Sequence, residues 1–188
     1  MKTYISLLRG INVSAQKKIL MSELKSLYEN LGLQNVQTYI QSGNVVFNSG
    51  SNIPPDKIIE KIEKAIVRKY NFSVSVLIRT VEELNIITAV NPFLNGKNIN
   101  AEKLYVTFLS EVPVNMYLDS LKKLDYSPDK FIVVGKEIFL YCVNGYGKTK
   151  LSNNYIENKL KLNATTRNWK TVNKLFELAS EQIKTEIS

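Results

Sequence analysis

The same order of strand and helix patterns occurs twice along this chain of 188 residues. Alternating apolar and polar residues predict strands, and apolar residues spaced three and four positions apart predict helices. Each half of the chain shows strand, helix, strand, strand, helix and strand, followed by one further helix. Self-similarity of this kind indicates that one structural unit is duplicated.

The first repeat is predicted from the start of the chain to residue 90. Its strands are expected at Tyr4–Arg9, Val36–Ile40, Val45–Phe47 and Val74–Arg79, and its helices at Met21–Leu31, Pro54–Lys69 and Val81–Val90. A turn at Gln41–Asn44 joins the second and third strands. Thr80 and Glu83 have the spacing of a capping box at the start of the last helix, and Pro92 ends that helix.

The second repeat is predicted over residues 104–188. Its strands are expected at Leu104–Leu109, Phe131–Val134, Ile138–Val143 and Ala164–Asn168, and its helices at Val114–Leu124, Lys150–Lys161 and Thr171–Ile183. The segment 91–103 is rich in Asn and contains Gly96, a composition typical of a linker. We therefore expect two domains, residues 1–90 and 104–188, joined by the linker 91–103.

A βαββαβ order is that of the ferredoxin-like arrangement, in which both helices pack on one face of an antiparallel sheet. The predicted fold class is therefore α+β, with two ferredoxin-like repeats. In such a unit the first two strands run in one direction and the last two run in the other. The end of the first strand then lies beside the turn between the second and third strands, and the third and fourth strands end together at the opposite edge.

The residue types present exclude several classes of enzyme. The chain has no histidine and one cysteine, Cys142. Histidine is the usual general base near neutral pH and the commonest metal ligand. Its absence excludes Ser-His-Asp hydrolases and Cys-His proteases, and a single cysteine excludes zinc and disulfide frameworks. No Asp-rich run resembles a calcium loop, so we expect no metal site, and the sequence does not identify a cofactor.

Positive charge exceeds negative charge, with 25 Lys and Arg against 17 Asp and Glu and a net charge of +8. Such an excess favours anionic partners, for example nucleotides or nucleic acid. Part of it forms an ordinary solvated stripe on the predicted helix at 54–69. The stripe consists of Lys57, Lys61, Lys64 and Arg68. No apolar run reaches the ~20 residues of a membrane span and no secretion signal is evident, so we expect a cytoplasmic protein with no membrane partner.

The leading candidate site lies where the third and fourth strands of the second repeat end. There the glycine-bearing segment 144–150 leads from a strand into a helix, a context in which backbone N–H groups bind anions. The segment matches neither a Walker loop nor a dinucleotide fingerprint. We expect its lysines to converge with an arginine fork and an indole face from the end of the fourth strand. The predicted ligand-binding residues are Lys148, Lys150, Arg167, Asn168, Trp169 and Lys170.

A structural alternative exists for the same residues. Trp169 has the character of a core residue, because large aromatic side chains are usually buried. Asn168 has the character of a helix cap, because its side chain can accept a hydrogen bond from the first turn.

A second candidate site is expected in the first repeat, where the loop after the first strand meets the turn at 41–44. Polar, glycine-bearing loops that directly follow apolar strands often carry binding groups. An enzyme at this edge would use Arg9 to stabilise an oxyanion and Ser42 or a tyrosine as the reactive hydroxyl. Ordinary turn chemistry is the structural alternative. The site would comprise Arg9, Asn12, Gln41, Ser42 and Asn44.

Four segments form a combination that is specific although each segment is short. They are Leu8–Val13, Thr38–Phe47, Asn91–Phe93 and Thr165–Trp169. Together they resemble the signature of a bacterial family, domain of unknown function 1697. The resemblance covers nearly the whole chain and implies a duplicated ferredoxin-like α+β architecture, but it assigns no catalytic residue. Ser14-Ala15 departs from the pattern, which has glycines at that place.

These observations support three hypotheses about function. The first is a cytoplasmic protein that binds an anionic or phosphate-bearing ligand, such as a nucleotide or nucleic acid, at the end of the second repeat. The second is an enzyme that works without histidine at the Arg9 edge. The third is a protein-interaction module that uses an exposed sheet edge or face.

Overall fold

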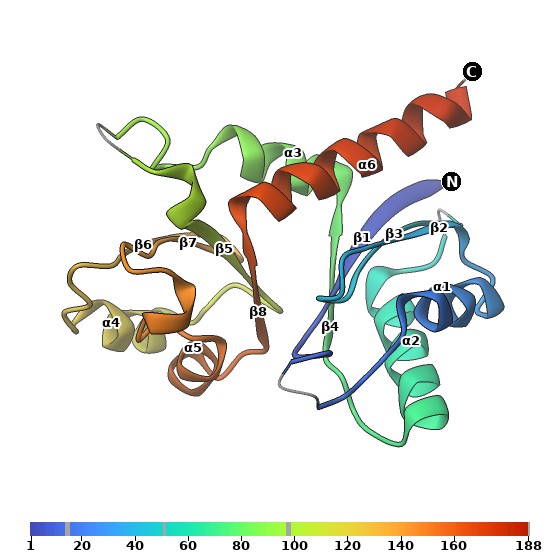
Figure 1. The fold of residues 1–188 in the computed structure, drawn as a ribbon, viewed down its shortest axis with the longest axis horizontal. Coiled ribbons are helices and arrows are strands. Elements are labelled where there is room, and N and C mark those ends of the chain that lie inside the picture. Colours follow the sequence, from blue (N-terminus) through green and yellow to red (C-terminus); the bar gives the residue numbers. More distant parts are fainter. Residues whose placement is uncertain (14–15, 51, 97–98, 188) are drawn as a thin grey trace. The chain divides into compact units, whose positions relative to one another are not determined.

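The computed structural model describes residues 1–13, 16–50, 52–96 and 99–187, and they form an α+β fold with two four-stranded antiparallel sheets (Figure 1). Ser14-Ala15, where the sequence departs from the family pattern, lies outside the described residues, as do two residues of the predicted linker. Among the described helices, none combines the length and the hydropathy that crossing a bilayer requires.

The first repeat forms one sheet with three helices. Its strands are β1 (Lys2–Leu8), β2 (Gln34–Tyr39), β3 (Asn44–Ser49) and β4 (Val76–Thr80). Its helices are α1 (Met21–Asn30), α2 (Pro55–Tyr70) and α3 (Val81–Ala89). The strands lie in the order β2-β3-β1-β4 across the sheet.

The second repeat has the same plan. Its strands are β5 (Leu104–Leu109), β6 (Lys130–Val134), β7 (Glu137–Tyr141) and β8 (Ala164–Asn168). Its helices are α4 (Asn115–Lys122), α5 (Asn153–Leu160) and α6 (Trp169–Ile187), with two short 3₁₀ helices, η1 (Ala101–Lys103) and η2 (Tyr146–Lys148). The strand order is β6-β7-β5-β8, which matches the first sheet element by element.

The predicted βαββαβ order is confirmed in both halves. The first strand of each repeat is central and pairs antiparallel with the third and fourth strands. In the first sheet Tyr4 lies opposite Phe47 on one side and Thr80 on the other. In the second sheet Tyr105 lies opposite Leu140 and Asn168. The strand directions are therefore those on which the predicted sites depend.

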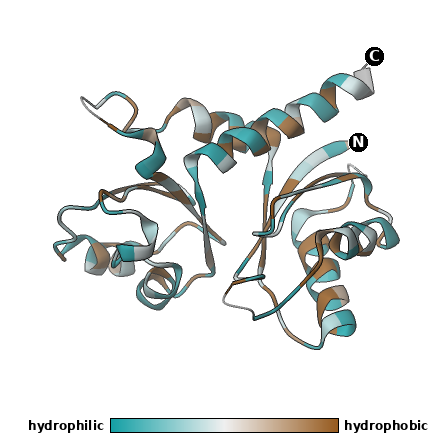
Figure 2. Cartoon of the chain, in the orientation of Figure 1, coloured by the Kyte–Doolittle hydropathy of each residue, from teal (hydrophilic) through white to brown (hydrophobic). Residues whose placement is uncertain are grey.

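The first core lies between one face of its sheet and the helices α1 and α2. Hydrophobic and hydrophilic residues occupy different sides of α2 (Figure 2). Apolar residues of α2 recur at three- and four-residue steps, Ile58, Ile62 and Ile66, and this stripe packs in the same cluster as Phe47 of β3. Tyr28 of α1 is also buried there. Because both helices share one cluster with the sheet, they cover the same face.

The second core repeats this arrangement with α4 and α5. Leu121 of α4 and Ile156 of α5 pack with Leu140 of β7 and Ala164 of β8. Cys142, directly after β7, is fully buried in the same cluster. Alternate strand residues point to opposite faces of a sheet, so Thr166 shares the helix-covered face with Ala164.

The chain divides into two compact units, residues 1–86 with the C-terminal segment from Lys174, and residues 87–173. Helix α6 belongs to both units: it begins in the second and continues into the first. Within the first unit, Gln182 Nε2 of α6 donates to the carbonyl of Asn35 at 2.7 Å. The predicted domain limits, 1–90 and 104–188, follow the sequence repeat instead and stay a prediction.

In both repeats the last strand continues directly into a helix. The predicted capping box at α3 is confirmed: Thr80 N donates to Glu83 Oε2 at 2.9 Å, and Glu83 N donates to Thr80 Oγ1 at 3.2 Å. At α6, Asn168 Oδ1 accepts from Thr171 N at 2.7 Å. Because Asn168 supplies this cap, α6 begins at Trp169, earlier than the predicted Thr171.

Candidate functional site

A pocket of about 220 Å³ in the second unit lies at the junction of β8 and α6. Three of the six residues predicted from the sequence line it, namely Asn168, Trp169 and Lys170. Ala101 and Glu102 of η1 complete the lining. The pocket forms there because β8 continues directly into α6, while η1 immediately precedes β5, the neighbour of β8 in the sheet.

The lining combines charged, polar and apolar groups. Lys170, Glu102 and Asn168 are exposed, whereas Trp169 keeps only 8% of its surface exposed. Asn168 uses its Oδ1 as the cap of α6, and its Nδ2 has no hydrogen-bond partner among the described residues. Trp169 and Asn168 thus take both structural roles considered in the sequence, core residue and helix cap. They still leave an indole surface and an amide donor at the pocket.

The other three predicted residues do not line this pocket in the described part of the chain. Lys148 lies in η2 and is exposed, as is Lys150. Hydrogen bonds from Ser127 lower the pKa of Asp125, and the charge of Lys150 adds a smaller lowering effect.

Arg167 is 7% exposed, and its guanidinium lies against its own strand. Nη1 donates to Thr165 Oγ1 at 2.7 Å and to the Thr166 carbonyl at 2.9 Å. The three residues at the start of α6 thus line one pocket, and Arg167 is not among the lining residues that the structure describes.

The loop after β7 does lie beside β8, but the contact is made by a tyrosine. Tyr146 OH donates to Thr166 Oγ1 at 3.0 Å, and the Tyr146 ring lies 5.2 Å from the ring of Tyr105, centroid to centroid. Thr166 Oγ1 also donates to Asn153 Oδ1 at 2.6 Å and lies 2.7 Å from Thr107 Oγ1. Sequence reasoning missed this network, because no motif distinguishes a threonine that joins a loop, a helix and two strands.

The second candidate site also has its segments side by side. Leu8 N donates to the Gly43 carbonyl at 2.8 Å, and Asn12 Nδ2 donates to the Gln41 carbonyl at 2.9 Å. The loop after β1 and the β2–β3 turn therefore meet at one edge, as the strand directions require. Arg9 and Ser42 are half-buried there, and Gln41 is exposed.

The two asparagines at this edge hold the backbone of their own loops. Asn12 receives a hydrogen bond from Ile19 N at 2.9 Å and donates back to the Ile19 carbonyl at 3.0 Å. Asn44 Nδ2 donates to the Tyr39 carbonyl and to Ser42 Oγ, both at 2.9 Å. These are contacts of a structural turn. A catalytic role for Arg9 and Ser42 stays a prediction.

A larger groove, about 520 Å³, lies in the first unit between α2 and the segment that leads into β4. The cation stripe predicted on the helix at 54–69 supplies Lys64 and Arg68 to this groove, but no motif in residues 73–75 predicted the opposite wall. The lining residues are Glu63, Lys64, Val67, Arg68, Ser73, Val74 and Ser75.

Two observations concern the Cys142 thiol and the acidic side chains of the described residues. Burial, and secondarily the charge of Asp129, raises the pKa of the Cys142 thiol to about 11, so the thiolate is scarce near neutral pH. Across the part of the chain that the structure describes, no group of three or more Cys, Asp or Glu residues could hold a metal ion.

Comparisons with known proteins agree on family and fold. The sequence model of the family "Protein of unknown function (DUF1697)" matches residues 1–139. The solved structure of the conserved bacterial protein SP0830 from Streptococcus pneumoniae is similar, with 26% identity over 95% of this chain and 98% of that chain, and a TM-score of 0.75. No curated protein matches significantly. The segment Thr165–Trp169, part of the resemblance found in the sequence, lies beyond the matched residues.

Proposed function

This chain belongs to the DUF1697 family, and from that premise we propose that it binds a small anionic ligand in the pocket at the start of α6. One observation carries the proposal: the consecutive residues Asn168, Trp169 and Lys170 line a single pocket opposite Ala101 and Glu102. The pocket places one cation, one amide and one indole within reach of a single small molecule. The proposal includes a cytoplasmic location.

The lining residues define the chemistry of the ligand. The Lys170 ammonium and the Asn168 amide nitrogen suit a phosphate or carboxylate. Trp169 and Ala101 offer apolar surface. Glu102 accepts hydrogen bonds, so a ligand that carries hydroxyl donors beside its anionic group fits better than a bare anion. A nucleoside monophosphate has this combination.

The size of the pocket limits how much of the ligand it can enclose. At about 220 Å³ it is smaller than the ~300–1,000 Å³ typical of sites that enclose a whole drug-sized molecule. It therefore suits the phosphate and part of the sugar of a mononucleotide. The net charge of +8 favours the approach of such anions, and added salt should weaken their binding.

Trp169 provides the test, because it is the only tryptophan and its fluorescence reports directly on the pocket. We expect titration with adenosine monophosphate to change this fluorescence saturably, and sulfate to compete only weakly. Lys170→Gln should weaken binding about two- to fivefold, the scale of an exposed charge contact. Lys122→Gln, which removes an exposed lysine of α4, is the matched control. The proposal fails if no saturable change occurs, or if both variants bind alike.

A further inference from the structure

The groove between α2 and residues 73–75 is rich in positive charge. Arg68 is exposed at the groove, and its guanidinium makes no hydrogen bond or ion pair with other described residues. Lys64 lines the same wall. Lys17 Nζ donates to the carbonyl of the lining residue Ser73 at 2.8 Å, which places a third cation next to the groove.

The acidic lining residue does not cancel these cations at the groove. Glu63 Oε1 accepts a hydrogen bond from Val76 N at 2.9 Å, so its carboxylate is directed at the backbone at the start of β4. The serines of the far wall add hydroxyl groups, and Val67 and Val74 form the apolar part of the lining. The groove therefore combines cations with hydroxyl donors, the groups that bind phosphate oxygens.

The cations continue beyond the groove along α2. Positive residues recur there at steps of three and four, which places them on one side of the helix. The row consists of Lys57, Lys61, Lys64 and Arg68, all of them exposed. With a rise of 1.5 Å per residue, the row spans roughly 16 Å, which exceeds the size of one phosphate group.

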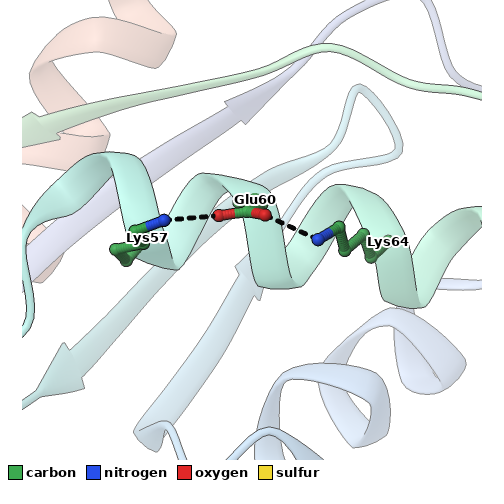
Figure 3. A network of polar contacts seen from close by, with 3 residues as sticks. All are labelled: Lys57, Glu60 and Lys64. Carbon is green, nitrogen blue, oxygen red and sulfur yellow. Dashed lines mark hydrogen bonds and ion pairs between the residues drawn. The ribbon is translucent and has the colours of Figure 1, made fainter.

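Within this row, two lysines already hold one anionic group. Glu60 accepts hydrogen bonds from Lys57 at 3.0 Å and from Lys64 at 2.5 Å (Figure 3). The bond from Lys64 first, and then that from Lys57, lowers the pKa of the Glu60 carboxyl to about 2. Glu60 therefore stays ionised in neutral solution and competes with any other anion for the two ammonium groups.

We propose that the groove and the row of cations on α2 bind the phosphate backbone of a nucleic acid strand. A strand matches the length of the row, because successive phosphates follow it at intervals of a few ångströms. Among the described residues, no aromatic side chain lines the groove, so the contacts are to phosphates rather than to stacked bases. The site lies in the first compact unit and takes a polymer, so it goes beyond the mononucleotide pocket of the second unit.

The experiment measures the anisotropy of a fluorescein-labelled 12-nucleotide poly(dT) strand at several salt concentrations. Arg68→Gln should weaken binding about three- to tenfold and reduce the salt slope by about 0.7, the value for one lost contact to a single strand. Lys25→Gln is the matched control, because it removes one exposed positive charge from α1 in the same unit. The control should weaken binding by less than about twofold and leave the salt slope unchanged.

Glu60→Gln gives a test in the opposite direction. It removes the competing carboxylate and frees Lys57 and Lys64, so we expect binding to tighten about two- to fivefold at low salt. Misfolding of a variant would weaken binding, so it cannot explain tighter binding. The proposal is wrong if Glu60→Gln weakens binding or if Arg68→Gln behaves like Lys25→Gln.

Further arms identify the ligand class and separate the two sites. Inorganic phosphate or adenosine monophosphate that displaces the strand at micromolar concentration would mean that the groove takes a small phosphate, contrary to the proposal. Lys170→Gln should leave strand binding unchanged. If Lys170→Gln abolishes it while Arg68→Gln does not, the strand binds in the second unit and the groove proposal is overturned.

Discussion

Arg79 and Arg167 occupy equivalent positions in the two repeats. Each is the fourth residue of the strand that ends its repeat, and they are 2% and 7% exposed respectively. In both, Nη1 donates to the carbonyl of the preceding residue at 2.9 Å. Across the sheet, Arg79 lies opposite Ile5 of β1 and Arg167 opposite Val106 of β5. The duplication therefore extends from the order of elements to one buried side chain and its hydrogen bond.

We predict that Arg167→Ala and Arg79→Ala lower the free energy of unfolding by a similar amount, about 2–3 kcal/mol. Each change removes hydrogen bonds from a charged donor and leaves buried acceptors without it. Urea unfolding followed by circular dichroism measures the effect. Lys148→Ala, at an exposed position, is the control and should change stability by less than about 0.5 kcal/mol. Arginine variants as stable as this control would contradict a structural role for the pair.

Two glycines at the edge of the first sheet give a matched pair of variants. Gly43 has φ +75°, and a Cβ there would lie 2.7 Å from Ile11 Cδ1 and 2.8 Å from Leu8 Cβ. Gly10 has φ +66°, but a Cβ there would meet no described atom within 4 Å. Gly10→Ala should therefore lower the free energy of unfolding only by the strain of a left-handed backbone at alanine, about 1–2 kcal/mol. Gly43→Ala should lower it by at least about 2 kcal/mol more because of the steric clash.

Thermal unfolding of both variants checks this prediction. It fails if Gly43→Ala and Gly10→Ala melt together, because the close packing of Gly43 against Ile11 would then have no energetic consequence. The comparison also bears on the second candidate site, since a glycine required by packing supports the structural interpretation of that turn.

Most of the fold could be predicted because each local signal agrees with its neighbours. Strands β5 and β8 begin and end at the predicted residues. The capping box at Thr80 marked the start of α3 correctly. The last helix was harder: an amphipathic pattern shows that α6 has an apolar face, but not that its segment from Lys174 lies with the first repeat.

The candidate site was predicted less well, because strand order places backbones and not side chains. Topology correctly put the loop after β7 beside β8, yet Tyr146 makes the contact with Thr166. Arg167 is one residue further along the strand, so its side chain points to the opposite face of the sheet. The sequence Ala-Thr-Thr-Arg-Asn alternates too weakly in hydropathy to show which face is covered. Sequence spacing alone therefore could not assign Arg167 to a side of the sheet.

We predict that stability falls at alkaline pH in part because of Tyr28. Its hydroxyl is fully buried and lies 2.9 Å from Ser6 Oγ, and burial raises its pKa well above the ordinary value of 10. A raised pKa means that the folded state holds the proton more tightly, so the full contribution is present below pH 10 and is lost as the pH rises above it.

Tyr28→Phe separates the contribution of Tyr28 to the pH dependence of stability from that of the other ionisable groups. At pH 7 the variant should lose about 1 kcal/mol, the value of a neutral hydrogen bond. Between pH 10 and 11 its free energy of unfolding should fall less steeply than that of the parent protein, by up to about 1.4 kcal/mol per pH unit. Urea unfolding at pH 7, 10 and 11 gives both quantities. Parallel pH profiles would show that Tyr28 does not resist ionisation.

Cys142 provides a prediction about accessibility. The thiol is fully buried, and its raised pKa of about 11 leaves little thiolate at pH 8. Both effects slow alkylation, because the thiolate is the reactive species and the reagent must reach it. We expect iodoacetamide to modify the folded protein at least about 100-fold more slowly than the urea-unfolded chain, as followed by mass spectrometry. Rapid modification of the folded protein would mean that the core cluster of β7 and α5 opens readily.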